Sequence, residues 1–455
     1  MSPSSGSPIT SSPLKTRVGF AVLLAILFLL LVWPVILSRS TALDKTGAAG
    51  DEVKFHLPTI YKMEKAWPHP DLSDLGGAQM TPTFHVLMAV TMHYGKTGVT
   101  GIRLVNSLSG LLLVVVVFWY ASKWTDAPTA FALCLPYLFS PFMLSSAMWL
   151  MTDNMAFLFV ALALACAAMF PPTPGRILGG GIAAMAATAV RQLHIWLIAP
   201  IAVASFFELM REKIAILAAP VFASPTPEPA TRPGKLVVCT AIAILAPIAA
   251  LMFYVVIWHG LLPPTAQLSG LHNHFTIVPL AFAQAGFCAF FLAPAVLEGP
   301  LWRFLKDRRV WAGALLCLAL AAIPHTQEPP GPSGALTELS HTPVLFGRIL
   351  ILLPPAALAG AAFAAFWIAA AEKGRGRAAF IILFGFLCWL AAQTVPVYAL
   401  RRYCDIILVM VIWLAAMSLT PRPRRLRFWI WTGAFALVQA GMAVIQIYRP
   451  VMQAR

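Results

Sequence analysis

The feature that most limits what this chain can fold into is a series of long segments without charge. Val18–Leu37 is an uncharged, mostly apolar run, and about 20 such residues suffice for one α-helix to cross a bilayer. Only 11% of the residues are charged and 60% are hydrophobic, whereas soluble proteins are about 25% charged. The sequence therefore excludes a soluble enzyme, a disordered chain and a secreted disulfide scaffold. It predicts an all-α polytopic membrane protein.

We expect one domain over residues 1–455, a bundle of about 11–13 transmembrane helices. The first apolar run is too long for a typical signal peptide core, so we expect it to stay as a span. Residues 1–17 are predicted to be a disordered cytoplasmic tail, and residues 38–100 an outer loop with short juxtamembrane helices, one from Pro58 to Ala66. The predicted spans are Val18–Leu37, 101–121, 128–149, 153–170, 176–190, 192–209, 236–258, 274–297, 310–323, 344–370, 378–397, 403–419 and 427–447.

The positive charges give the predicted spans a direction. Cytoplasmic loops of membrane proteins are rich in Lys and Arg, and a cytoplasmic N-terminus puts the clusters Arg303–Arg309 and Arg422–Arg427 on that side. All 10 histidines and many acidic residues then fall in or near outer segments. The net charge of +15 comes without a long Lys/Arg tract or a recognition domain, so the expected partner is the lipid bilayer and not nucleic acid. The 7 cysteines lie singly in apolar segments and are interpreted as packing residues.

Acidic residues at the outer ends of the predicted spans are the first candidates for chemistry. Asp51 and Glu52 lie in the predicted outer loop, where desolvation and neighbouring charges can tune a carboxylate to act as a general base. A solvated acidic pair is the alternative. Asp153 lies at the edge of two apolar segments, where a charge is costly unless it is paired or hydrated. Its alternative role is helix capping, by Thr152 or by Asp153 itself.

Basic residues on the predicted outer side are the second group. Arginine binds phosphate oxygens through two parallel hydrogen bonds, although a long side chain can also reach lipid headgroups. His272 and His274 are spaced as a metal pair but lack convincing third and fourth ligands, and the chain has no nucleotide-binding motif. The candidates for substrate phosphate are Arg191 with Gln192, Arg348, and Arg401, Arg402 and Tyr403.

Taken in order, these segments resemble the dolichyl-phosphate-glucose-dependent alpha-1,2-glucosyltransferases, which are membrane glycosyltransferases of the GT-C class. The resemblance covers essentially the whole membrane region at low similarity, and it implies a divergent bacterial member. The matching stretches are Asp51-Glu52 with Phe55-His56-Leu57-Pro58, Arg103-Leu104-Val105-Asn106, Thr152-Asp153, Val190-Arg191-Gln192 and Arg401-Arg402-Tyr403.

Two departures from the family pattern affect what the resemblance implies. The family has one residue between its Asp-Glu and its Phe-His, whereas this chain has two. Alignment on the Phe-His-Leu-Pro stretch makes Glu52 the family's aspartate, and an insertion makes it Asp51. The late Asp-Asn-Arg-His-Tyr element of the family is not intact, and His341 and Arg348 mark its place. We therefore expect the chemistry to be retained and the acceptor to differ.

The resulting hypothesis is an inverting glycosyltransferase that moves a hexose, glucose by resemblance, from a polyprenyl-phosphate-sugar donor to a glycan or lipid-linked acceptor. Asp51 or Glu52 would be the base, and Arg191, Arg401 or Arg402 would stabilise the leaving phosphate. His56, Asp153, His272 and His274 would position sugar hydroxyls. The resemblance implies no nucleotide cofactor and no metal. We expect a bacterial inner membrane with a periplasmic active site, or an endoplasmic reticulum membrane with a lumenal one. The alternatives are a transporter or flippase of lipid-linked sugars, and a non-catalytic scaffold.

Overall fold

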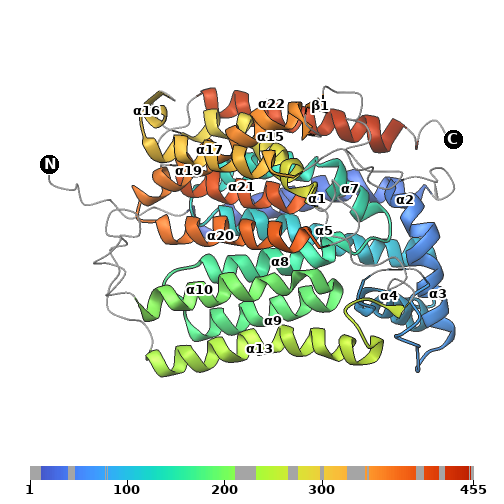
Figure 1. Cartoon of the computed structure of the whole chain (residues 1–455). Coiled ribbons are helices and arrows are strands. Elements are labelled where there is room, and N and C mark those ends of the chain that lie inside the picture. Colours follow the sequence, from blue (N-terminus) through green and yellow to red (C-terminus); the bar gives the residue numbers. More distant parts are fainter. Residues whose placement is uncertain are drawn as a thin grey trace.

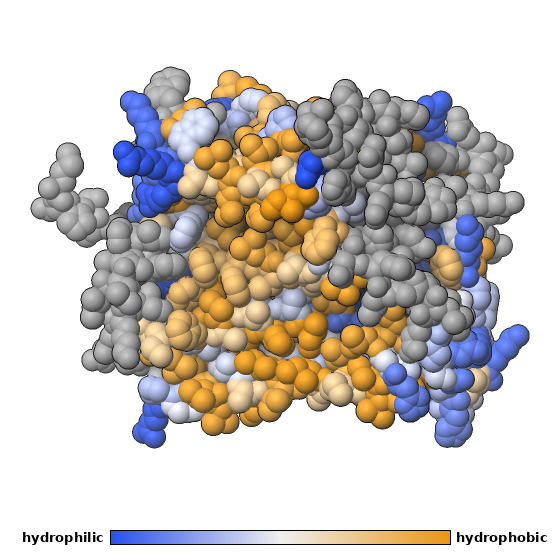
Figure 2. Space-filling model, in the orientation of Figure 1, coloured by the Kyte–Doolittle hydropathy of each residue, from blue (hydrophilic) through white to orange (hydrophobic). Residues whose placement is uncertain are grey.

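The chain forms a bundle of roughly parallel and antiparallel helices, with a group of short helices at one end (Figure 1). The computed structural model describes residues 12–38, 47–76, 78, 80–210, 232–264, 275–297, 302–324, 344–345, 348–395, 404–419, 426–449 and 451. An apolar band covers the middle of the face seen in Figure 2, and hydrophilic residues gather at its two ends. This distribution is typical of a protein that crosses a bilayer.

The long helices coincide with the apolar segments of the sequence. Within the described residues, 8 single helices are long and apolar enough to cross a membrane. They are α1 (Leu14–Leu37), α5 (Val99–Ala121), η2 with α10 (Gln192–Leu197 and Ile198–Leu209), α13 (Pro233–Trp258), α15 (Ile277–Val296), η3 with α19 (Leu350–Leu352 and Leu353–Ala371), α20 (Gly376–Gln393) and α22 with η5 (Leu426–Ala443 and Val444–Tyr448).

Several predicted spans are shorter or differently shaped than expected. The predicted span 128–149 is broken into α6 (Ala127–Leu138) and α7 (Pro141–Met148), which meet at 70°. Pro141 lacks the N–H that would continue the α6 ladder, so it starts a new helix instead. Helix α1 begins at Leu14, so residues 14–17 are helical and not part of a disordered tail. The start of the predicted span 344–370 forms a two-stranded ribbon, β1 (Val344–Leu345) with β2 (Arg348–Ile349).

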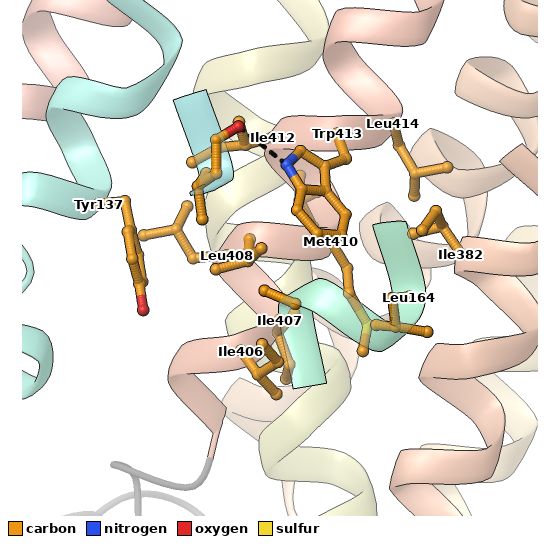
Figure 3. Close-up of a cluster of buried hydrophobic side chains, with 14 of the residues drawn as sticks. Tyr137, Leu164, Ile382, Ile406, Ile407, Leu408, Met410, Ile412, Trp413 and Leu414 are labelled. Carbon is orange, nitrogen blue, oxygen red and sulfur yellow. Dashed lines mark hydrogen bonds between the residues drawn. The ribbon is translucent and has the colours of Figure 1, made fainter. Parts of the chain in front are cut away.

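The shorter helices differ in how far protein surrounds them. They are α8 (Asp153–Ala168), α9 (Pro174–Val190), α16 (Trp302–Leu305), α17 (Arg308–Ala322) and α21 (Asp405–Ser418). All residues of α21 are buried, and it packs against α5, α6, α15, α19 and α20. Figure 3 shows its apolar side chains against Leu164 and Ile382, with the Trp413 indole donating a hydrogen bond to the carbonyl of Val117 (3.1 Å). A helix enclosed in this way need not match the thickness of the lipid.

Small residues allow two pairs of helices to approach closely. Gly313 of α17 and Gly360 of α19 face each other, and a Cβ atom on Gly360 would overlap the carbonyl oxygen of Gly313. Gly286 of α15 lies against the carbonyl oxygen of Pro355 in α19 in the same manner. Such contacts are common between membrane helices, where association depends on close packing.

The group of short helices corresponds to the predicted outer loop. It contains α2 (Gly47–Asp51), the π-helix η1 (Glu52–His56), α3 (Leu57–Lys65) and α4 (Thr83–Gly95). Its own apolar cluster includes Ile60, Phe84 and Met88, and it continues to Trp258 at the end of α13. The Trp258 indole donates a hydrogen bond to the carbonyl of Leu72 (2.9 Å). The short helices are therefore fixed on the ends of the long helices, and the expected polytopic bundle with juxtamembrane helices is confirmed.

Candidate active site

Glu52 is a buried carboxylate that joins three separate segments. It is the first residue of η1, and its side chain is 0% exposed. Its oxygens accept hydrogen bonds from the Arg103 guanidinium, at 3.1 Å from Nε and 2.5 Å from Nη2, and from the backbone N–H of Leu150 at 2.7 Å. A buried charge is tolerated when its lone pairs are satisfied in this way. Glu52 therefore ties the outer helices to α5 and to the connection between α7 and α8.

The helical path that carries Asp51 and Glu52 contains a π-helical turn. In η1 the backbone N–H of Leu57 donates to the carbonyl of Glu52, five residues earlier. An α-helix closes the same ring over four residues, so a π turn takes up one additional residue without ending the helix. The helical path from Gly47 to Lys65 thus continues through this turn. A turn of this kind is compatible with the one-residue insertion before Phe55 that the resemblance implies if Asp51 is the family's aspartate.

Asp51 and Glu52 differ in their surroundings although they are adjacent. Asp51 ends α2 and is partly exposed, whereas Glu52 is fully buried. Adjacent residues on a helix point about 100° apart, which is why one faces the bundle and the other its rim. Protonation of Glu52 would remove the charge attraction in its ion pair with Arg103.

Arg103 and Asn106 of α5 bind the segments on either side of this junction, η1 and the end of α7. They are three residues apart and therefore lie on one face of the helix, and both are buried. The Asn106 side-chain amide donates to the carbonyls of Ser146 (3.0 Å) and Trp149 (2.8 Å), at the end of α7. Both residues belong to the stretch Arg103-Leu104-Val105-Asn106, for which the resemblance implies no particular role. The structure shows that they hold η1 and the residues before Asp153 in place.

Asp153 and Arg191 form a second buried ion pair. Asp153 is the first residue of α8, and Arg191 follows α9 in an extended conformation. The Arg191 guanidinium donates to the Asp153 carboxylate, and both residues are buried. Thr152 makes no side-chain capping hydrogen bond to α8, so capping by Thr152 is not supported. The next residue, Gln192, accepts a hydrogen bond from the backbone N–H of Thr81 (3.2 Å), which connects this pair to the outer segment.

His56 is paired with a histidine that the sequence did not single out. His56 Nδ1 and His85 Nε2 are 3.0 Å apart, and the two rings are stacked with an interplanar angle of 19°. Both side chains are buried, and burial lowers the pKa of His85 to about 3. His85 is therefore neutral near pH 7. One of the two facing nitrogens carries a hydrogen and donates it in a hydrogen bond, and the other nitrogen is the acceptor. The signal for this pair is weak in the sequence because 29 positions separate the two residues.

The remaining predicted residues that the structure describes do not take part in the two buried ion pairs. The Arg348 guanidinium donates to the carbonyls of Ala322 and Ile323 at the end of α17, as a basic residue does when it caps a helix; its substrate role stays a prediction. Asp405, which follows the predicted Arg-Arg-Tyr segment, accepts a hydrogen bond from Ser140 (2.7 Å) and is close enough to Asp153 for their charges to interact. The predicted site residues that lie outside the described part of the chain are His272, His274, Arg401, Arg402 and Tyr403.

The described residues contain no group of three or more His, Cys, Asp or Glu side chains that could hold a metal ion. What the described residues do bring together is a continuous polar region at one end of the bundle. The Glu52 carboxylate binds the backbone three residues before Asp153, and Asp153 binds Arg191. Segments from the outer loop, from the start of α8 and from the end of α9 therefore meet.

Comparison with known proteins gives similarity only to solved structures. No protein-family model and no curated protein sequence matches the chain. ArnT from Cupriavidus metallidurans in the apo state is similar over 88% of this chain and 78% of its own, with 15% identity and a TM-score of 0.38. The same protein bound to undecaprenyl phosphate is similar over 95% of this chain and 89% of its own, with 14% identity and a TM-score of 0.41.

A third similar structure is the archaeal oligosaccharyltransferase AglB from Archaeoglobus fulgidus, solved in complex with an inhibitory peptide and a dolichol-phosphate. The similarity covers 96% of this chain and 55% of AglB, with 14% identity and a TM-score of 0.43. These values describe a likeness over most of the length of this chain. They do not by themselves assign the chain to a family.

Proposed function

We propose that this chain is a GT-C-type inverting glycosyltransferase that transfers a hexose from a polyprenyl-phosphate donor to a hydroxyl of a glycan or lipid-linked acceptor. The observation that carries the proposal is the meeting of Asp51-Glu52, Asp153 and Arg191 at one end of an apolar bundle. These residues come from three of the segments that resemble the glucosyltransferases. A lipid-linked donor suits such a site, because its chain stays in the bilayer while its sugar reaches the polar end of the bundle.

In this proposal Asp51 is the general base, and Glu52 holds it in position. The acceptor oxygen attacks the anomeric carbon from the face opposite the phosphate, and its proton passes to the Asp51 carboxylate. The bond from the anomeric carbon to the phosphate oxygen breaks, and the electron pair leaves with the polyprenyl phosphate. The products are an inverted glycoside and the lipid phosphate. This chain's own groups supply the proton acceptor and the fixed geometry.

The other residues of the site have supporting roles. Asp153 and His56 are proposed to orient sugar hydroxyls, since each is held rigidly by a buried partner. Arg191 fixes the Asp153 carboxylate through their ion pair. Arg401 and Arg402 remain the proposed phosphate ligands on sequence grounds, together with Tyr403, His272 and His274 for the sugar.

The test is a transfer assay with purified full-length protein and polyprenyl-phosphate-glucose. We expect Asp51→Asn to lower kcat by about 100- to 10,000-fold, the usual contribution of a general base, with unchanged thermal unfolding. Asp71→Asn, in an exposed part of the same outer segment, is the matched control and should transfer normally. Wild-type kcat in Asp51→Asn would refute the assignment of the base. Polyprenyl-phosphate-mannose and UDP-glucose, run in parallel, test the choice of sugar and of carrier.

The same preparation separates the enzyme from a flippase. A flippase would move the lipid-linked sugar across a vesicle membrane without forming a glycoside. The two ion pairs of this site lie where helices begin and end, between elements at one end of the bundle. Transporters more often place their ionisable groups near the midplane of the membrane. Translocation without any transfer to a range of acceptors would overturn the proposal.

A further inference from the structure

At the end of the bundle opposite the candidate active site, three cations from different elements lie together. Arg17 belongs to the first turn of α1, Lys123 follows α5, and Arg176 lies in the first turn of α9. The Arg17 guanidinium donates to the Ser122 hydroxyl (3.0 Å), beside Lys123. Arg176 donates to the carbonyl of Pro171 (2.9 Å). We refer to Arg17, Lys123 and Arg176 as the basic triad.

The hydrogen bonds of the basic triad make it continuous. Lys123 extends to Met169, the residue that follows α8, and Arg176 binds the carbonyl of Pro171 two residues further on. Arg17 also lies over the ring of Trp119, with its guanidinium carbon 4.6 Å from the ring centroid. The three side chains thus follow one path across the ends of α1, α5, α8 and α9.

Within the described residues, no carboxylate forms an ion pair with any of these three side chains. Arg17 and Arg176 donate to hydroxyl and carbonyl oxygens. The Lys123 ammonium has the Met169 sulfur at 3.0 Å as its partner, and a thioether is a weak acceptor for a cation. Burial lowers the pKa of Lys123, and the nearby charges of Arg176 and Arg17 act in the same direction. The three cations of the triad therefore repel one another, and in the part of the chain that the structure describes they have no carboxylate partner.

We propose that the basic triad binds the phosphate of an anionic lipid headgroup in the leaflet at this end of the bundle. The place of the triad favours a lipid over a soluble anion, since the helices α1 and α5 beside it carry exposed apolar residues, among them Val18, Val22 and Leu112. Basic pockets between membrane helices on the cytoplasmic side bind the headgroups of anionic lipids in this manner. The enrichment of Lys and Arg in cytoplasmic loops also predicts that this end of the bundle faces the cytoplasm. The site is independent of the proposed transfer reaction.

The test is a lipid-binding titration of the purified full-length protein in an uncharged detergent. Phosphatidylglycerol is the probe, phosphatidylcholine is the zwitterionic control, and native mass spectrometry counts the bound lipids. We expect one tight phosphatidylglycerol site in the wild type, and binding about 100-fold weaker in the triple variant Arg17→Gln, Lys123→Gln and Arg176→Gln, from the usual contribution of basic residues near a membrane.

Two controls keep the result specific. The triple variant Lys235→Gln, Lys306→Gln and Arg308→Gln removes equal charge from exposed positions on the same predicted side and should bind as the wild type does. Lys123→Gln alone, an exposed position, tests the site if loss of Arg17 impairs folding, and it should weaken binding about 5-fold. Equal weakening in both triple variants, or equal affinity for phosphatidylcholine, would overturn the proposal. Displacement of the lipid by millimolar inorganic phosphate would show a soluble-anion site instead.

Discussion

The buried ion pair between Glu52 and Arg103 should stabilise the junction of the outer helices with the bundle. In Arg103→Met the Glu52 carboxylate, which is 0% exposed, loses every guanidinium hydrogen bond and keeps the Leu150 N–H. Removing one partner of a buried pair costs about 3–5 kcal/mol, because a charge is left uncompensated. We therefore expect the free energy of unfolding of Arg103→Met to fall by about that amount.

A double-mutant cycle separates the pair from its surroundings. Glu52→Gln should also destabilise the protein, since it leaves the guanidinium buried without its counterion. The variant with both Glu52→Gln and Arg103→Met has no buried charge at this position and should be more stable than the sum of the single effects predicts. For residues in direct contact, coupling energies of about 0.5–3 kcal/mol are usual, and we expect a value at the upper end.

The assay is unfolding by SDS in mixed micelles, followed by tryptophan fluorescence. Arg303→Met is the matched control, because its ion pair with Glu372 is open to solvent, with side-chain exposures of 58% and 46%. An exposed pair contributes about 0–1 kcal/mol, so this variant should unfold nearly as the wild type does. The reasoning is refuted if Arg103→Met loses less than about 1 kcal/mol, or if the two substitutions at the pair are additive within about 0.5 kcal/mol.

Two further predictions concern helix packing and pH. Gly360→Ala should lower the free energy of unfolding by about 1–3 kcal/mol, because the new Cβ would overlap the carbonyl oxygen of Gly313. The control is Gly433→Ala, where a Cβ meets open space, and it should be neutral or stabilising in the same SDS assay. His85 has its pKa lowered to about 3 by burial, so its contribution to stability is present above about pH 6.5 and is lost as the pH falls towards 3, by about 2 kcal/mol between pH 6.5 and 5. His85→Gln should flatten this part of the pH–stability curve. An unchanged slope would contradict the conclusion that burial of His85 causes the pH dependence.

The sequence predicted the long helices well because their signal is local. An uncharged run of about 20 residues has few alternatives to a membrane-spanning helix. The break between α6 and α7 was missed, since an apolar segment with Pro136 and Pro141 can bend as well as continue. The predicted span 403–419 matches α21 (Asp405–Ser418) in extent. Its complete enclosure by other helices depends on how the bundle packs, and no single segment carries that information.

For the candidate site, the sequence identified the acids and Arg191 but not their partners. Glu52 and Arg103 are 51 positions apart, and Asp153 and Arg191 are 38 apart. A pairing over such distances depends on how the helices pack. The sequence therefore marked charged residues at helix ends as candidates, and only the structure shows which of them compensate each other.

The choice between Asp51 and Glu52 as the proposed base depends on side-chain type, which the sequence gives, and on burial and partners, which the structure gives. Side-chain type gives no preference, because both carboxylates could accept a proton. They are adjacent on one helical path and point about 100° apart, and in the structure Glu52 is buried while Asp51 is partly exposed. Arg103 and the Leu150 N–H select Glu52 for the buried position. The π turn then lets Phe55 and His56 follow one residue later without moving either acid, which leaves Asp51 at the rim as the proposed base.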